Sequence, residues 1–171
     1  ITPSTSASSY SNKLPKITWN VTEKNLLSIQ VKVNNGNYTA LAGTNTGNAT
    51  ISDLESEKIN TISVRAIDRA GNVSSEKKFT YYYDRTKPVI NNFKISPDTS
   101  EEIHSDNEEP KITFDVSENT LKNVKITIKN DEGEQKTVYD GSSAKGTVTV
   151  NKGVLNSGLN AIFLSATDKA E

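Results

Sequence analysis

Two aspartates and one acidic segment are the residues whose types and spacing could bind a metal ion. Asp68 and Asp84 follow the ends of two neighbouring predicted strands, and the segment 97–109 is rich in further carboxylates. Calcium in proteins takes about six to eight oxygen ligands, mostly carboxylates and carbonyls. The sequence therefore raises the expectation of Ca²⁺ where two domains meet, with Asp68 and Asp84 among its ligands.

The alternative is that these carboxylates have only local roles. Asp68 would then cap its own turn in the sequence Asp-Arg-Ala-Gly-Asn, and the acidic segment would be solvated surface. EF-hand and nonapeptide calcium spacings are absent from the sequence. This favours the alternative, because carboxylates without a ligand motif are usually ordinary surface.

Enzymatic chemistry has little support. Cysteine is absent, which excludes thiol catalysis, disulfide bonds and cysteine-ligated zinc. His104 is the only histidine, and it stands in the charged segment without a nucleophile at a suggestive spacing. No carboxylate pair recurs in both halves, and there is no glycine-rich phosphate loop. We therefore expect no catalytic activity in this chain.

Two aromatic features could bind a carbohydrate. In the run Tyr81–Tyr83 at least one ring must face outward, and Tyr82 is the candidate. The alternative, which we prefer, is an ordinary tyrosine of an edge strand. Trp19 is the only tryptophan, and Phe114 occupies its place in a second copy of the same pattern. Trp19 is therefore predicted to be a core residue.

Composition bounds the class of protein and its partners. Of 171 residues, 33% are apolar and 24% are charged, and the net charge of −1 is spread without a basic stripe. Binding to nucleic acid and insertion into a membrane are therefore not expected. A chain without cysteine and rich in Lys and Asn fits a bacterial exported protein. The absence of Met indicates a segment of something longer.

Alternation of apolar and polar residues predicts short strands almost throughout. Asn34, Asn35 and Gly36 predict a type I′ hairpin turn, and the Gly/Asn/Thr-rich segment 42–48 predicts a loop. The strands are expected at 15–22, 26–33, 37–41, 49–51, 60–67 and 73–83, and again from residue 89 onward.

The chain contains an internal repeat. Residues 110–128 align without gaps to 15–33, and Asn160 aligns to Asn60. Five extra residues are expected between 136 and 153. The repeat predicts an all-β chain of two tandem antiparallel immunoglobulin-like β-sandwiches. Their predicted bounds are 1–84, with a weakly structured lead-in at 1–13, a short linker at 85–88, and 89–171.

The second sandwich is predicted to lack its last strand, the counterpart of 73–83. Such a sandwich exposes an apolar groove and an unpaired strand edge. The missing strand could be cut off, disordered or supplied by another chain.

Ala66–Asn72 has the pattern A-x-D-x-A-G-N, and it is followed by a strand and the linker Asp84-x-Thr86-x-Pro88. This arrangement resembles the bacterial immunoglobulin-like repeats of exported surface proteins, mostly Gram-positive. The second copy keeps Ala166, Asp168 and Ala170. The resemblance implies stalks, adhesin segments or accessory domains, and some related modules bind calcium at their junctions.

The expected function is that of a non-catalytic spacer at the cell surface or cell wall or in a secreted protein, with a part in adhesion. The expected partners are neighbouring domains of the same chain, and a host or cell-wall glycan or protein; we expect a monomer. The alternative is a pair of accessory domains in an extracellular protease or glycosidase, with carbohydrate as ligand.

Overall fold

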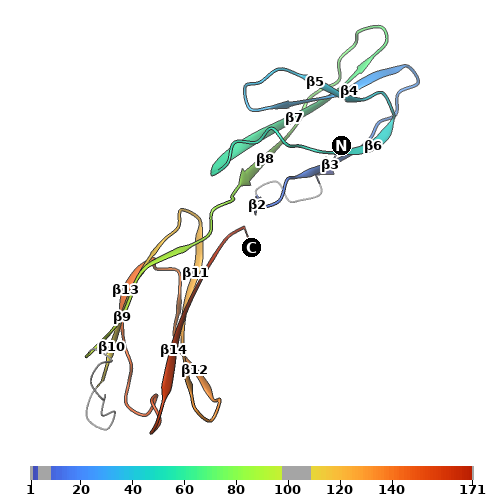
Figure 1. Ribbon diagram of the computed structural model, residues 1–171. Coiled ribbons are helices and arrows are strands. Elements are labelled where there is room, and N and C mark those ends of the chain that lie inside the picture. The colour runs from blue at the N-terminus through green and yellow to red at the C-terminus, as the bar shows by residue number, and fades with distance from the viewer. Residues whose placement is uncertain (1, 4–8, 98–108, 171) are drawn as a thin grey trace. The chain divides into compact units, whose positions relative to one another are not determined.

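The computed structural model describes residues 2–3, 9–97 and 109–170, and all regular secondary structure in these residues is β-strand (Figure 1). The chain divides into two compact units, Ile1–Thr86 and Lys87–Lys169. Each unit consists of two sheets that enclose a hydrophobic core of their own.

The first unit pairs a small sheet with a large one. The three-stranded sheet has the order β1-β3-β6 and the five-stranded sheet the order β2-β8-β7-β4-β5. The strands are β1 (Thr2–Pro3), β2 (Ser9–Ser11), β3 (Lys16–Asn20), β4 (Leu26–Val33), β5 (Thr39–Ala42), β6 (Thr46–Thr50), β7 (Lys58–Asp68) and β8 (Lys77–Tyr83).

All strand pairs of the first unit are antiparallel except one. β2 pairs with β8 in parallel, with Ser9 opposite Tyr81 and Ser11 opposite Tyr83. The sequence marks β2 poorly, because its residues are mostly Ser and lack alternation. β2 and β8 are the first and the last strand of the large sheet in chain order, and they lie side by side in it.

The second unit repeats this plan with two three-stranded sheets, ordered β13-β10-β9 and β12-β11-β14. Among the described residues, no strand pairs with the outer edge of β14, whereas β7 of the first unit is covered there by β8. The strands are β9 (Val89–Ser96), β10 (Lys111–Ser117), β11 (Leu121–Asn130), β12 (Gln135–Gly141), β13 (Lys145–Thr149) and β14 (Asn160–Asp168).

The internal repeat is visible in both pairing and core. Buried Ile17 and Trp19 of β3 correspond to buried Ile112 and Phe114 of β10. The same backbone hydrogen bond closes both small sheets, from Ile51 N to Pro15 O at 3.0 Å and from Val150 N to Pro110 O at 2.8 Å. In each unit the chain crosses several times between the two sheets, as in immunoglobulin-like domains. The predicted fold class, two tandem immunoglobulin-like β-sandwiches, is confirmed.

The loop predicted at 42–48 is wrong at its end, because β6 begins at Thr46. β6 has the sequence TGNAT, whose small residues carry no apolar alternation. Small residues are needed here, since Gly47 lies directly opposite Trp19 in the β3–β6 pair. A Cβ atom on Gly47 would lie 2.5 Å from the indole ring.

The predicted type I′ turn is also wrong. Asn34 has a φ of 52°, but Gly36 is not in the left-handed region that this turn requires. Asn34 turns inward, where its side chain accepts a hydrogen bond from Thr61 N at 2.8 Å and donates one to Asn60 Oδ1 at 3.1 Å. The hairpin loop is longer than the sequence pattern predicts because Asn34 is held by β7.

Most of the five extra residues of the second copy lie in the β11–β12 hairpin. The last one lies between β13 and β14, because Ile51 corresponds to Val150, an offset of 99, and Asn60 corresponds to Asn160, an offset of 100. Val31 pairs with Thr39, and its counterpart Ile126 pairs with Tyr139. The hairpin of the second unit is therefore longer than that of the first. The register of the strand pairs locates the extra residues, which an alignment of the two sequence copies alone cannot do.

Candidate functional site

Asp68 fixes the turn that follows β7. Its carboxylate accepts hydrogen bonds from Ala70 N at 2.9 Å, from Asn72 N at 2.8 Å and from Asn72 Nδ2 at 2.8 Å. The hydrogen bond from the Asn72 side chain, aided by those from the backbone, holds the pKa of Asp68 below its ordinary value. Gly71, with a φ of 88°, completes the turn. The carboxylate thus has the capping role that the sequence offered as the alternative to metal binding.

Asp84 directly follows β8 and is completely buried. Its backbone N–H donates to Ser11 O at 3.1 Å, which extends the β2–β8 pair by one residue. Its Oδ1 accepts a hydrogen bond of 3.4 Å from the Thr86 hydroxyl. Asp84 therefore ties the end of the first unit both to β2 and to the segment that follows.

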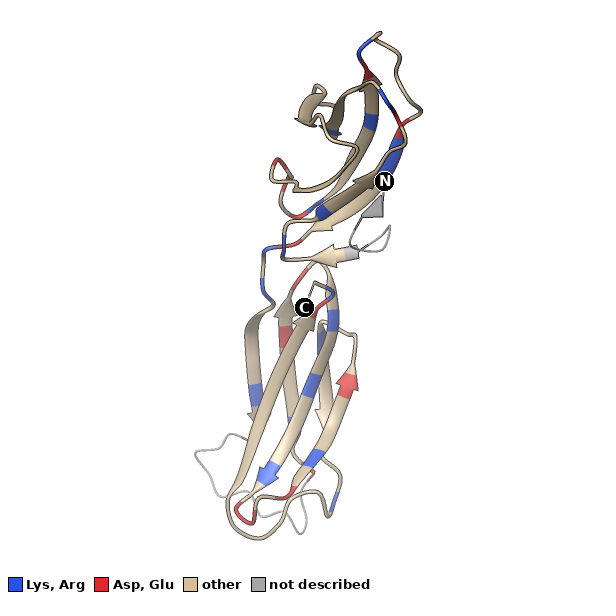
Figure 2. Ribbon diagram, turned by 90° about the vertical axis from the view of Figure 1, so that its right-hand side faces the viewer, with Lys and Arg blue, Asp and Glu red and all other residues tan. Residues whose placement is uncertain are grey.

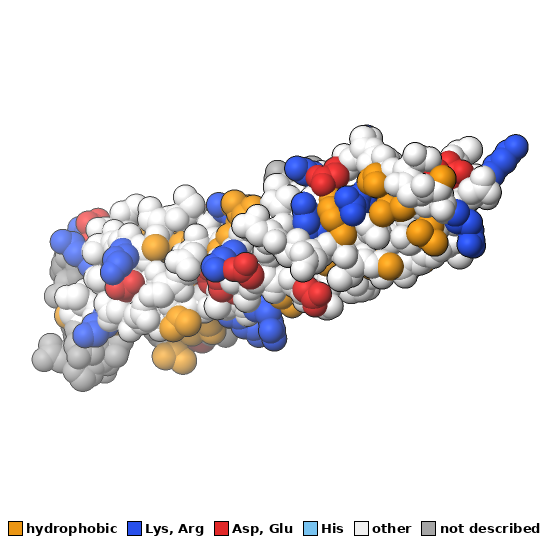
Figure 3. All heavy atoms as spheres, turned by 90° about the horizontal axis from the view of Figure 1, so that it is seen from above, with side chains coloured by type: hydrophobic (Ala, Val, Ile, Leu, Met, Phe, Trp, Pro, Cys, Tyr) orange, Lys and Arg blue, Asp and Glu red, His pale blue; other side chains and the backbone are white. Residues whose placement is uncertain are grey.

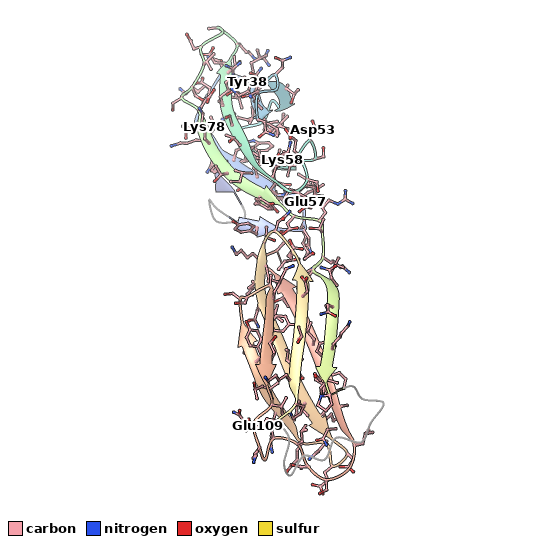
Figure 4. All side chains as sticks on the ribbon, turned by 90° about the vertical axis from the view of Figure 1, so that its left-hand side faces the viewer. Tyr38, Asp53, Glu57, Lys58, Lys78 and Glu109 are labelled. Carbon is pink, nitrogen blue, oxygen red and sulfur yellow. The ribbon has the colours of Figure 1, made fainter. Side chains whose placement is uncertain are left out.

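Glu57, beside Asp84, holds the start of the predicted linker (Figure 4). Its carboxylate accepts hydrogen bonds from Arg85 N at 2.7 Å, Thr86 N at 3.1 Å and the Thr86 hydroxyl at 3.1 Å. Burial raises the pKa of Glu57, but the hydrogen bonds, first that from Arg85 N, outweigh it and the pKa lies below the ordinary value. Sequence reasoning missed this residue, because a Glu in a polar turn carries no distinguishing signal.

Asp68 and Asp84 do not meet. β7 runs from Lys58 to Asp68, and Tyr83, which precedes Asp84, pairs with Lys58. At about 3.3 Å per residue, the two aspartates are separated by roughly 30 Å, the length of β7. One ion cannot bind both carboxylates, which corrects the expectation of a calcium site that they share.

Within the described ranges, no group of three or more His, Cys, Asp or Glu side chains is placed to hold a metal ion. Most of the acidic segment 97–109, including His104, lies outside the described residues. Among the described carboxylates, Asp68 is used in its own turn and Glu57 in hydrogen bonds to the start of the linker.

Tyr82 is half-buried on the face of β8 opposite to the core residue Tyr81. The Tyr10 ring of β2 covers it, with the ring centroids 4.9 Å apart and the planes inclined by 37°. Its hydroxyl donates to Glu57 O at 3.0 Å. Tyr82 therefore helps to attach β2 and the turn that contains Glu57.

A cluster that the sequence did not reveal lies around Tyr38 (Figure 4). The guanidinium carbon of Arg65 lies 3.7 Å from the centroid of the Tyr38 ring, and Lys32 Nζ lies 4.8 Å from it. The Tyr38 hydroxyl donates to Glu76, which also pairs with Lys78 Nζ at 3.2 Å. Burial, together with the bond to Glu76, raises the pKa of Tyr38. These contacts connect β4, β7 and the start of β8 on the outer face of the large sheet.

Charged side chains of both signs are spread over the two units (Figure 2), and the face in Figure 3 shows them interspersed with apolar and neutral ones. Some of the described lysines form ion pairs, such as Lys58 with Glu55 at 2.6 Å and Lys145 with Asp115 at 2.8 Å. In the part of the chain that the structure describes, no helix could cross a membrane.

A cavity lies in the second unit, where β9 faces β14. It has a volume of ≈ 680 Å³. Its floor is the fully buried Ile112, and Asn160 and Ile162 of the β14 edge form one wall. The remaining lining residues are Phe93, Lys94, Ile95 and Ser96 of β9.

Comparison with known proteins finds similarity only among solved structures. No family model matches the chain, and no curated protein matches it. The FN1–FN3 domains of chicken CNTN1 are 13% identical with a TM-score of 0.45, over 96% of this chain and 60% of that one. The D00–D0 domain of Intimin is 16% identical with a TM-score of 0.34, over 96% and 95%.

A third similar structure is the α-L-rhamnosidase from Dictyoglumus thermophilum. It is 12% identical with a TM-score of 0.34, over 95% of this chain and 24% of that one. This chain thus spans less than two thirds of the CNTN1 fragment and about a quarter of the rhamnosidase. At these values the similarities add nothing to the fold, which follows from the strand order and pairing described above.

Proposed function

We propose that this chain is a pair of non-catalytic immunoglobulin-like modules that act as a mechanical spacer. The observation that carries the proposal is the parallel pairing of β2 with β8 in the first unit. In a parallel pair, the chain enters β2 at one end of the pair and leaves β8 at the other. Tension between the two chain ends of this unit then loads the hydrogen bonds of the pair together, in shear.

Three further contacts reinforce this pair. The buried Tyr81 hydroxyl donates to Lys13 O, just beyond β2. The Asp84 N–H donates to Ser11 O, and the rings of Tyr10 and Tyr82 pack together on the outer side. Bonds loaded at the same time must break in one step, whereas bonds loaded one after another can open in sequence. A clamp of this kind suits a module that transmits force.

The hydrogen bonds that Glu57 accepts from Arg85 and Thr86 also suit a module that transmits force. They fix the first linker residues to the body of the first unit, so the chain leaves the unit from a defined point. The linker is short as well, since β8 ends at Tyr83 and β9 begins at Val89. Short, pinned connections transmit force with little slack.

A cell-surface or secreted location in a bacterium, and adhesion to a glycan or protein, remain proposals. They are supported by the A-x-D-x-A-G-N resemblance and by the cysteine-free composition. The alternative role, as accessory domains of an extracellular hydrolase, would use the same spacer mechanics. Calcium binding is supported by the resemblance alone, since Asp68 serves its own turn and Asp84 bonds Thr86 at the start of the linker.

Single-molecule pulling on the whole chain tests the proposal. The first unit is expected to open in one step that releases the residues from Ser9 to Tyr83, a contour-length gain on the order of 250 Å. Tyr81→Phe should lower the rupture force. Tyr38→Phe is the control, because it removes a hydroxyl whose hydrogen bond to Glu76 does not involve β2. It should leave the rupture force unchanged. Gradual opening at low force would contradict a spacer under tension.

A further inference from the structure

A hollow lies on the outer face of the large sheet in the first unit, in the middle of the sheet. Thr61 and Ser63 of β7 form its floor, and both side chains are short. Lys32 of β4 and Lys78 of β8 lie on either side of Ser63, so the three residues form one row across the sheet (Lys78 is labelled in Figure 4). The hollow has a volume of ≈ 430 Å³. Short side chains between long ones thus leave room for a small ligand.

The lining of the hollow is basic, although the chain as a whole carries a net charge of −1. Among the described residues that line it, three are lysines and one, Glu55, is acidic. Glu76 lies beside the hollow and pairs with Lys78 Nζ at 3.2 Å, and Arg65, the next outward residue of β7 after Ser63, offsets its charge. The surplus of positive charge favours an anionic ligand.

The lysines keep donors for such a ligand, because an ammonium group has three N–H donors. Lys58 Nζ lies 2.6 Å from Glu55 Oε2, and Lys78 Nζ lies 3.2 Å from Glu76 Oε2, which uses one donor of each lysine. Lys32 Nζ lies 3.8 Å from Glu76 Oε1, which is too far for a hydrogen bond. An oxyanion above Ser63 could therefore accept hydrogen bonds from both Lys32 and Lys78.

Uncharged groups complete the lining. Thr61 contributes a hydroxyl and Asn35 an amide, and both groups can hydrogen-bond to the hydroxyls of a sugar. Ile59 stands at the rim with 68% of its surface exposed, so it offers an apolar contact to the C–H face of a sugar ring. An extended peptide fits less well, since it binds by adding to an unpaired strand edge, and β7 is paired on both sides.

The immunoglobulin-like fold does not require these residues. Ser63 and Lys32 are opposite each other in the first unit, and their counterparts Phe163 and Thr127 are opposite each other in the second. The second unit therefore has a large ring where the first has the floor of the hollow, and a neutral residue where the first has a lysine. The basic hollow is a feature of the first unit that the repeat does not explain.

We propose that this hollow binds an acidic sugar, which is a uronic acid or a sulfated residue of a polysaccharide. The carboxylate or sulfate group lies above Ser63 between Lys32 and Lys78, and the sugar extends along β7 toward Lys58 and Ile59. The site goes beyond the proposed spacer role and gives the proposed adhesion a ligand and a location. If it binds no sugar, the spacer role is unaffected, because the pulling experiments test that role separately.

The test titrates the whole chain with short ligands, followed by calorimetry and by backbone NMR shifts. We expect saturable binding of trigalacturonate, which carries carboxylates, or of a heparin tetrasaccharide, which also carries sulfates, with shifts centred on Thr61 and Ser63. The tighter of the two identifies the preferred oxyanion. Maltotriose, which is neutral, and triglutamate, which is an acidic peptide, should bind at least about tenfold more weakly. Failure of both acidic sugars, or equal binding of maltotriose or triglutamate, would overturn the proposal.

Two triple variants separate the hollow from overall charge. The first replaces the lysines of the lining and should weaken binding at least about tenfold. The second removes the same charge from exposed lysines outside the lining and should weaken binding by less than about twofold. The variants are Lys32→Gln/Lys58→Gln/Lys78→Gln and Lys16→Gln/Lys24→Gln/Lys111→Gln. Equal losses in both variants would reduce the binding to general electrostatic attraction and overturn the proposal.

Thr61→Phe fills the hollow without a change in charge. An aromatic side chain suits a strand position, so the first unit is expected to stay folded, and the thermal midpoint checks this. Binding of the acidic sugar should fall at least about tenfold, because the ring occupies the space above the floor. Undiminished binding by the folded variant would place the sugar elsewhere and overturn the proposal.

Discussion

Trp19 lies flat against Gly47, its partner across the β3–β6 pair, with no room for a side chain between them. A Cβ atom at Gly47 would lie 2.5 Å from Trp19 Cζ2 and 2.9 Å from Cε2. The indole N–H donates to Thr44 O at 3.0 Å, so its polar atom is satisfied inside the unit. Trp19 is 5% exposed and is a core residue, as the sequence predicted.

This relationship predicts the cost of a single methyl group. Gly47→Ala should destabilise the first unit by about 1–3 kcal/mol, because the ring or the strand must move to admit the Cβ atom. Gly146→Ala makes the same change opposite Phe114, where the Cβ would lie 3.0 Å from the ring, and it should cost less. Chemical denaturation of the two variants measures the difference.

The double variant Trp19→Phe/Gly47→Ala separates crowding from strand propensity. If crowding is the cause, the smaller ring admits the methyl group and the double variant loses less stability than the two single changes together. Strict additivity of the two changes would show that the indole does not clash with residue 47.

The repeat and the strand alternation were enough to predict the fold class and the core. Ile17, Trp19 and their counterparts Ile112 and Phe114 are buried, since alternation is a direct consequence of a sheet with one buried face. The sequence did not mark β2, and it placed the strand of β6 at 49–51 rather than at 46–50. β2 is only three residues long, and β6 reads Thr-Gly-Asn-Ala-Thr, so neither contains an alternating run of large apolar residues.

The Asp68 turn predicts a pH-dependent contribution to stability. Its pKa is lowered in the folded state by the Asn72 hydrogen bonds. The stabilisation is therefore fully present above the unfolded-state pKa of about 3.9 and is lost as the pH falls through the folded-state value. Asp68→Asn should lower the unfolding free energy at pH 7, and the gap to the wild type should narrow as the pH falls below about 4.

Asn72→Ala removes the side-chain donor to Asp68 and should reduce the same pH-dependent component. Denaturation curves at several pH values for both variants provide the measurement. A gap that stays constant down to the acid limit would mean that the Asp68 charge does not stabilise the turn.

The Glu57 contacts predict local protection of the linker start. Glu57→Gln weakens the hydrogen bonds from Arg85 N and Thr86 N, because the acceptor loses its charge. Hydrogen exchange at these two amides should accelerate by roughly three- to tenfold. Glu55→Gln is the matched control on the same turn, since Glu55 pairs with Lys58 instead, and it should leave both amides unchanged. Equal effects of the two variants on exchange at these amides would contradict the anchoring of the linker start by Glu57.

The separation of Asp68 from Asp84 predicts that neither contributes to a calcium site shared by the pair. Calcium and a chelator should give the same thermal midpoint for the first unit. A higher midpoint in calcium that Asp68→Asn or Asp84→Asn abolishes would contradict this prediction. It would show that the carboxylate binds calcium in addition to its local hydrogen bonds.

Their separation follows from the antiparallel pairing that the sequence already predicted for the two strands, and the expectation of a shared calcium site did not take that pairing into account. In an antiparallel pair, consecutive strand ends lie at opposite ends of the pair, and Asp68 and Asp84 follow β7 and β8 in this way. Glu57 was missed for a related reason. Its partners, Arg85 and Thr86, are brought to it only by the pairing of Lys58 with Tyr83.

The most direct test of the spacer account compares two directions of force on the first unit. The chain contains no cysteine, so one introduced cysteine defines the second attachment point beside an N-terminal handle. Attachment at position 87 loads the β2–β8 pair in shear, and attachment at position 75 loads it from one end. Both positions, Lys87 and Ser75, are exposed. The account predicts a clearly higher rupture force for position 87, and equal forces at the two positions would contradict it.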